Sequence, residues 1–126
     1  METKLVNKEI EIHSTPLEVL HIRDMGVEVE FDDIHEERWR FIFRPYQALK
    51  ITTIDCFNTT PLLFDGKRPA HLIEVINSQW LTILKAELFK KDQKSDFLDK
   101  AKHYIFPFQD SIIEVVAWGD YTIQKI

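Results

Sequence analysis

One histidine and two acidic residues stand out in a mostly apolar stretch near the end of the chain, "HYIFPFQDSIIEVVAW" at positions 103–118. They are His103, Asp110 and Glu114, and their side chains are of the types that perform general acid–base chemistry. A hairpin turning at Gln109 and Asp110 makes Asp110 an ordinary turn residue. It places Glu114 among apolar side chains, where a buried carboxyl group marks a candidate site.

We therefore predict a pocket that contains His103 and Glu114. The two side chains meet only if the strands twist enough to bring them together. The alternative is that Glu114 lies at the sheet surface or pairs with a lysine or an arginine.

A second polar feature is the segment 24–37, which holds seven Asp or Glu residues and no Lys or Arg. The chain has 21 acidic and 16 basic residues and a net charge of −5, so its negative character is largely local. Clustered like charge steers the approach of an oppositely charged partner. We expect a basic protein to contact the acidic side chains Glu28, Glu30, Asp32, Asp33, Glu36 and Glu37.

Two alternatives to this contact surface remain open. In the first, the acids form a solvated strand face paired with Arg38 and Arg40, which leaves Asp33, Glu36 and Glu37 without obvious partners. In the second, "DDIHEE" supplies oxygen ligands to calcium, although it lacks the ligand spacing and the glycine of an EF-hand.

The sequence lacks the common motifs of metal-binding, phosphate-binding and hydrolase sites. The five histidines are scattered without HxxxH or HExxH spacing, and there is no P-loop and no nucleophile elbow. We expect no metal and no cofactor, and serine hydrolase chemistry has no motif to support it. The single cysteine, Cys56, lies in the apolar run "ITTIDCF", which predicts a buried structural thiol.

The length of 126 residues suits a single domain spanning 1–126. The N-terminus alternates charged and apolar residues, unlike a signal peptide. No apolar run approaches the roughly 20 residues of a membrane helix. We therefore expect a cytoplasmic protein that does not bind a membrane. Its negative net charge argues against nucleic acid as a partner.

The clearest local structure is a hairpin formed by "VEVEFD" and "RWRFIFR", in which apolar and charged residues alternate. One register satisfies both faces, and a slip of one residue would bury the charges. It pairs Phe31 with Trp39, Val29 with Phe41, Val27 with Phe43, Asp32 with Arg38 and Glu30 with Arg40.

Other strands are predicted at 7–13, 45–57, 71–77 (where a helix also fits) and 121–126, besides the hairpin at 103–118. A helix over 79–91 is capped by Ser78, and a shorter one over 96–102 is capped by Ser95. The segment 15–26 is either a short helix or a loop with a second strand. The fold class is thus α+β, a curved antiparallel meander of about six to eight strands with one longer and one short helix on one face.

Several of these elements together resemble a known group of proteins. They are the "VEVEF" and "RWRFIF" strands, "ALKITTIDCF", "INSQWL" at the start of a helix and "HYIFPFQDSIIEVVA". The combination resembles small bacterial proteins found beside secreted polymorphic toxins, some of which are assigned as immunity proteins. The resemblance implies an inhibitor of a toxin, and it contains no catalytic motif.

Taken together, these features lead us to expect a binding protein without catalysis, of the immunity type, whose acidic surface blocks a basic toxin partner. One alternative is a small-molecule-binding domain or an enzyme, with a cavity in the curved sheet near Glu114. Another is a structural homodimer in which the two-faced apolar hairpin pairs with its own copy.

Overall fold

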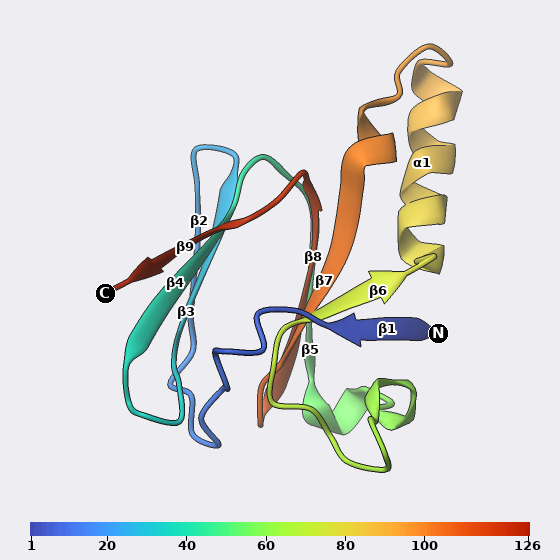
Figure 1. Cartoon of the computed structure of the whole chain (residues 1–126). Coiled ribbons are helices and arrows are strands. Elements are labelled where there is room, and N and C mark those ends of the chain that lie inside the picture. Colours follow the sequence, from blue (N-terminus) through green and yellow to red (C-terminus); the bar gives the residue numbers. More distant parts are fainter.

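The computed structural model describes residues 1–126, and its strands form two antiparallel sheets with one α-helix beside them (Figure 1). The five-stranded sheet has the order β1-β6-β7-β8-β5, and the four-stranded sheet has the order β2-β3-β4-β9. The strands are β1 (Glu2–Leu5), β2 (Val19–Arg23), β3 (Gly26–Asp32), β4 (Arg38–Phe43), β5 (Tyr46–Thr53), β6 (Ile73–Ile76), β7 (Ala101–Pro107), β8 (Ser111–Trp118) and β9 (Thr122–Lys125). The α+β class with antiparallel pairing is therefore as expected, but nine strands are divided between two sheets instead of forming one meander.

The β3–β4 hairpin has the predicted register. Phe31 lies opposite Trp39, and Asp32 lies opposite Arg38. Alternation explains this outcome, because only this pairing puts the aromatic side chains on one face and the charges on the other.

The β7–β8 hairpin is buried on both faces, as its sequence predicted. One face carries Tyr104, Phe106 and Phe108, and it packs against the aromatic side chains of β3 and β4 in the main core. Phe106 contacts Phe31 and Phe41 with ring centroids 6.0 and 5.6 Å apart. The two sheets are thus held together by interlocking aromatic rings.

The other face of the hairpin is covered by two separate apolar clusters. At one end, Ile105 and Ile112 pack with Leu62, which belongs to the chain between β5 and β6. At the opposite end, Val116 packs with Leu98, and α1 (Gln79–Lys91) lies over them. The helix therefore lies on the side of the five-stranded sheet that faces away from the four-stranded one (Figure 1).

Helix α1 has the predicted limits, and Ser78 caps it by accepting a hydrogen bond from the backbone N–H of Leu81. The predicted shorter helix is only a 3₁₀ turn, η3 (Phe97–Lys100). Ala101 and Lys102 instead begin β7, because pairing with β8 satisfies their backbone groups. Two further 3₁₀ turns follow β5, η1 (Ile54–Cys56) and η2 (Thr60–Leu62).

Of the two alternatives for the segment 15–26, the loop with a strand is confirmed, because β2 lies there and its backbone pairs with β3. Two other local predictions need correction. The first strand is β1, and within 7–13 only Ile12 forms an isolated bridge, to Asp33. Cys56 is exposed, because the 3₁₀ turn η1 ends the alternation that would have buried it.

No helix in the structure is both long enough and apolar enough to cross a membrane.

Because Phe106 joins the two sheets, its truncation should be costly. We expect Phe106→Ala to lower the free energy of unfolding by about 3–5 kcal/mol, through lost burial and the cavity left behind. The matched control is Phe89→Ala on α1, where the ring is 58% exposed and the change should stay within about 0.5 kcal/mol. Urea unfolding followed by circular dichroism measures both, and similar losses in the two variants would contradict this account of the core.

Candidate functional site

Three buried polar side chains form a hydrogen-bonded chain on the helix-facing side of the β7–β8 hairpin. The Ser78 Oγ lies 2.7 Å from the Nδ1 of His103, and the Nε2 of His103 lies 2.9 Å from the Oε1 of Glu114. The three residues are only 5%, 4% and 4% exposed, respectively. His103 and Glu114 come from the two strands of one hairpin, and Ser78 reaches them from the start of α1, 25 positions before His103.

Strand geometry brings His103 and Glu114 together. His103 lies opposite Val116, and Glu114 lies opposite Ile105, so the two polar residues are diagonal neighbours on one face. Diagonal pairs across an antiparallel ladder are within reach of long side chains. The strands therefore twist enough to bring the two side chains together, and Glu114 is paired with His103.

Ser78 reaches this pair because β6 runs directly into α1. The connecting residue Asn77 has a φ of 54°, a left-handed conformation that asparagine tolerates better than most residues. The sharp turn at Asn77 leaves Ser78 at the first turn of the helix, with its hydroxyl facing β7. Strand, left-handed turn and helix start together fix the position of the oxygen.

Lys50 and Trp80 complete the cluster at its outer side. Lys50 pairs with Glu114 across the β5–β8 ladder, and its Nζ lies 3.6 Å from the second carboxyl oxygen. The same ammonium lies 4.3 Å from the centroid of the Trp80 ring, and that ring meets His103 edge-on at 5.2 Å. Glu114 thus has a histidine on one oxygen and a lysine near the other.

These side chains line a pocket of about 470 Å³. Its apolar wall comes from Trp80 and from the end of β6, and its polar groups include both charged and neutral donors. The lining consists of Met1, Glu2, Lys50, Val75, Ile76, Asn77, Ser78, Gln79, Trp80, His103 and Glu114. We call this hollow the Ser78 pocket.

The sequence predicted two members of this site and missed the others. His103 and Glu114 were singled out as polar residues in an apolar hairpin. Ser78 was interpreted only as a helix cap, and Lys50 was placed in a strand without a role. The available signal was weak: a serine preceding a helix is common, and its contact with His103 is long-range.

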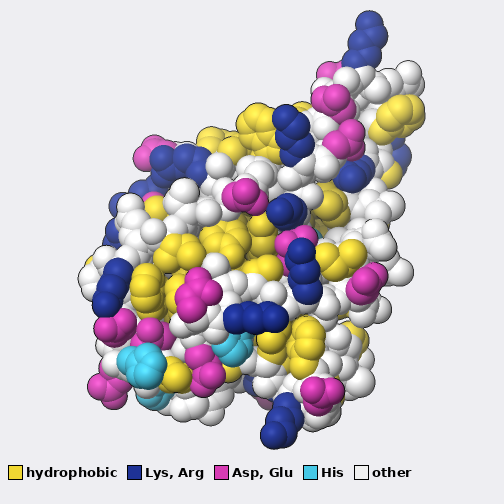
Figure 2. Space-filling view, in the orientation of Figure 1, with side chains coloured by type: hydrophobic (Ala, Val, Ile, Leu, Met, Phe, Trp, Pro, Cys, Tyr) yellow, Lys and Arg dark blue, Asp and Glu magenta, His cyan; other side chains and the backbone are white.

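The predicted acidic contact surface is largely neutralised by its own neighbours. Three basic residues on the outer face of the four-stranded sheet match the three acids of β3. Arg23 Nη2 lies 2.9 Å from Glu28, Arg40 Nε lies 3.0 Å from Glu30 and Arg38 Nη1 lies 2.8 Å from Asp32. Figure 2 likewise shows acidic and basic side chains intermingled on the visible side of the molecule.

The loop 33–37 is arranged differently from the sequence-based expectation. Asp33 is buried and accepts hydrogen bonds from the Trp39 indole and from the backbone N–H groups of His35 and Glu37. Glu37 pairs with Lys125 at 2.8 Å. Of the three loop acids expected to be unpaired, only Glu36 lacks an ion-pair or hydrogen-bond partner for its side chain.

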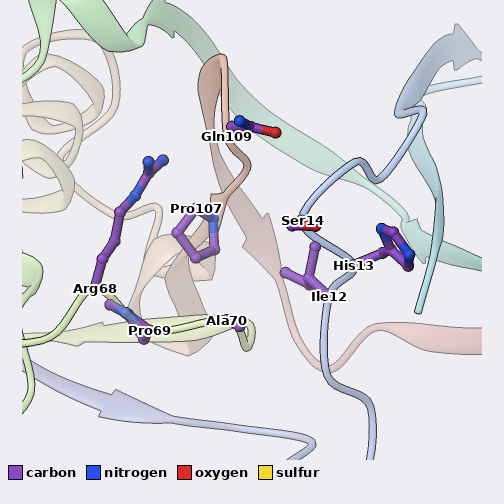
Figure 3. A pocket seen from close by; sticks show the side chains of 8 residues that line it. All are labelled: Ile12, His13, Ser14, Arg68, Pro69, Ala70, Pro107 and Gln109. Atoms are coloured by element: carbon purple, nitrogen blue, oxygen red, sulfur yellow. The ribbon is translucent and has the colours of Figure 1, made fainter. Parts of the chain in front are cut away.

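A second hollow, of about 300 Å³, lies between the segments 12–14 and 68–70 (Figure 3). Its cationic group is Arg68, which donates a hydrogen bond to the carbonyl of Phe108 and has the carboxyl of Asp110 nearby. One terminal nitrogen of the guanidinium is thus engaged by the chain itself, while its buried Nε has no hydrogen-bond partner. This hollow lacks the convergent buried groups of the Ser78 pocket.

No three His, Cys, Asp or Glu side chains converge in a way that could hold a metal ion. No protein-family model matches the chain, and neither a curated protein nor a solved structure matches it. The chemistry of the Ser78 pocket must therefore be inferred from its own residues.

Asp33 should make stability depend on pH. Burial by itself raises the pKa of Asp33, but hydrogen bonds from Trp39, Glu37 and His35 together outweigh it and lower the pKa below 3.8. A lowered carboxyl pKa stabilises the fold above the ordinary pKa, and the contribution is lost as the pH falls through the folded-state value.

We expect Asp33→Ala to lower the free energy of unfolding by about 1–3 kcal/mol at neutral pH, because three N–H donors lose their acceptor. The difference from the parent should shrink as the pH falls below 3.8, where the parent carboxyl becomes protonated. Urea titrations over a pH series measure this difference in the free energy of unfolding, and the variant Glu36→Ala, at an exposed position, is the control. A pH-independent difference would show that the carboxylate charge is not the cause.

Proposed function

We propose that this protein is a small-molecule-binding domain that accepts a carbonyl-containing ligand in the Ser78 pocket. The observation that carries the proposal is the hydrogen-bonded chain of Ser78, His103 and Glu114 lining a hollow of ligand size. Pockets of a few hundred Å³ with a few convergent polar groups are the usual form of such sites.

The position of these polar groups supports a functional role over a purely structural one. His103 and Glu114 lie between two apolar clusters on the same face of the hairpin. Apolar residues at both positions would join those clusters without the desolvation cost of burying a carboxylate. Replacing buried ionic groups by apolar ones is often neutral or stabilising, so stability alone does not account for their presence.

The polar groups at the mouth define the chemistry of the ligand. Lys50 offers an ammonium, and the first turn of α1 leaves the backbone N–H groups of Gln79 and Trp80 without intrahelical acceptors. Donors of both kinds favour an oxygen acceptor, such as an ester, amide or carboxylate oxygen. The ring of Trp80 provides the apolar surface for a short acyl chain.

Trp80 should report occupancy directly. The chain has three tryptophans, so its indole N–H groups give three resonances, and the one that is missing in Trp80→Phe belongs to Trp80. With butyrate and methyl butyrate as probes, we expect a saturable shift of the Trp80 resonance while those of Trp39 and Trp118 stay in place.

The matched variant is Lys50→Met, which keeps most of the apolar stem and removes the charge. It should weaken the binding of butyrate about tenfold, the effect of losing one charge-assisted contact, and change that of methyl butyrate less. If the probes shift Trp39 or Trp118 and leave Trp80 unmoved, the Ser78 pocket is not their binding site.

We also propose a second candidate, an immunity-type inhibitor without catalysis, for which one surface feature gives support. The tip of the loop 33–37 exposes the apolar side chain of Ile34 beside the acidic Glu36. The contact surface is correspondingly narrower than the six acids taken from the sequence, since most of those are paired on their own sheet. A partner would need a basic surface with an apolar contact at its centre.

The inhibitor candidate is tested with the toxin-like protein encoded next to this chain, if its genome carries one, by a binding titration. Glu36→Lys should weaken binding at least tenfold, because it reverses the charge of the unpaired acid. Asp33 is unsuitable for this test, since its loss would disturb the loop. Glu87→Lys on the exposed face of α1 is the control, and equal affinity for the parent and Glu36→Lys would remove this loop from the interface.

A further inference from the structure

We propose that Ser78 is a nucleophile that accepts an acyl group from a small ester, with His103 as its general base and Glu114 orienting the imidazole. The inference rests on the proposed ligand pocket and assigns it a reaction. Its basis is the direct juxtaposition of a buried hydroxyl, imidazole and carboxylate at the wall of that pocket.

The direction of the hydrogen bonds follows from what each group can do. An ionised carboxylate only accepts hydrogen bonds, so the Nε2–H of His103 donates to Glu114. In the neutral ring the other nitrogen, Nδ1, then has a free lone pair and accepts from the Ser78 hydroxyl. This is the arrangement in which a histidine removes the proton of an attacking hydroxyl while a carboxylate holds the ring.

The start of α1 favours negative charge on the same oxygen. The backbone N–H of Leu81 donates to the Ser78 Oγ at 3.1 Å. The positive end of the helix dipole lies at this position and stabilises a developing alkoxide. The oxygen still has a lone pair that neither the cap nor His103 uses, and this pair is available for attack.

Donors for the substrate oxygen are present beside the nucleophile. The backbone N–H groups of Gln79 and Trp80 belong to the first helical turn, and Lys50 lies on the neighbouring strand. When a carbonyl carbon is attacked, its oxygen becomes an oxyanion that such donors stabilise. The nucleophile, base, orienting carboxylate and oxyanion donors therefore all lie at one pocket.

The proposed reaction has two steps. The Ser78 Oγ bonds to the ester carbonyl carbon, its proton passes to the Nδ1 of His103, and the C–O bond to the alcohol breaks as that alcohol takes the proton. A water molecule then adds to the acyl carbon, gives a proton to His103, and releases the carboxylic acid as the proton returns to Ser78. Water is the second reactant, and no change of oxidation state occurs.

A fluorophosphonate probe tests the nucleophile in the intact chain. Attack by Ser78 forms an Oγ–P bond, breaks the P–F bond and releases fluoride, which leaves a stable adduct. Peptide mass mapping then decides among the four serines of the chain, Ser14, Ser78, Ser95 and Ser111. We expect one adduct, on Ser78. This experiment uses the parent protein alone, so it does not depend on whether a variant folds.

Variants separate the chemical role from the capping role. Ser78→Asn retains a helix cap of similar quality but has no hydroxyl, so labelling should disappear while the helix remains. His103→Gln should slow labelling of Ser78 at least 100-fold, the lower range of general-base contributions. Ser111→Ala, at the far end of β8, should label like the parent.

The outcomes distinguish this inference from the proposed function. Labelling of Ser78 that depends on His103 supports the nucleophile. An unlabelled Ser78, with methyl butyrate still shifting the Trp80 resonance, overturns the nucleophile and leaves the binding pocket. An unlabelled Ser78 with no shift of Trp80 overturns both, and labelling that is unchanged in His103→Gln overturns the assignment of the base.

Discussion

The β7–β8 hairpin is apolar on both faces, and the rest of the fold follows from the need to cover it. A sheet exposed to water on one side would leave half of these side chains in solvent, which the hydrophobic effect opposes. The four-stranded sheet covers one face with aromatic rings, and α1 together with the chain between β5 and β6 covers the other. The layered architecture is the solution to this single constraint.

The same constraint explains why the polar chain on the helix-facing side is conspicuous. Two apolar clusters cover the two ends of that face, and His103 and Glu114 occupy the gap between them. Low exposure makes an unpaired carboxylate there unfavourable, and the chain supplies Glu114 with two partners, Lys50 on β5 and His103 on β7. On the outer face of the four-stranded sheet the acids instead pair with arginines at the surface. Little net charge therefore remains there to attract a basic partner.

Local patterns predicted the elements whose sequence restricts them to one arrangement. The β3–β4 register, the β7–β8 turn and the limits of α1 each follow from alternation or from a cap. The division into two sheets could not be predicted, since it depends on which strands pair over long distances. The strand β9, for example, pairs with β4 although about 80 residues separate them, and no local pattern specifies such a pairing.

The candidate site shows the same difference: residues that break a local pattern could be predicted, and contacts between distant segments could not. Glu114 could be identified because a carboxylate among Ile and Val residues breaks a local rule. Ser78 obeys its local rule as a helix cap, so its second contact was invisible until β6 and β7 were placed side by side. The expectation that the loop acids lack partners was wrong for Asp33 and Glu37 for a related reason, because the Trp39 indole and Lys125 reach them from other elements.

The hydroxyl oxygen of Ser78 takes part in two structures at once, the first turn of α1 and the chain of polar groups in the pocket. Any coupling between the two is reciprocal: the free energy by which a formed helix start favours the contact with His103 equals the free energy by which that contact favours the helix start. Fraying of α1 would in turn release the oxygen from its position beside His103. The hydrogen-bonded chain of the pocket therefore persists only while the first turn of α1 is formed.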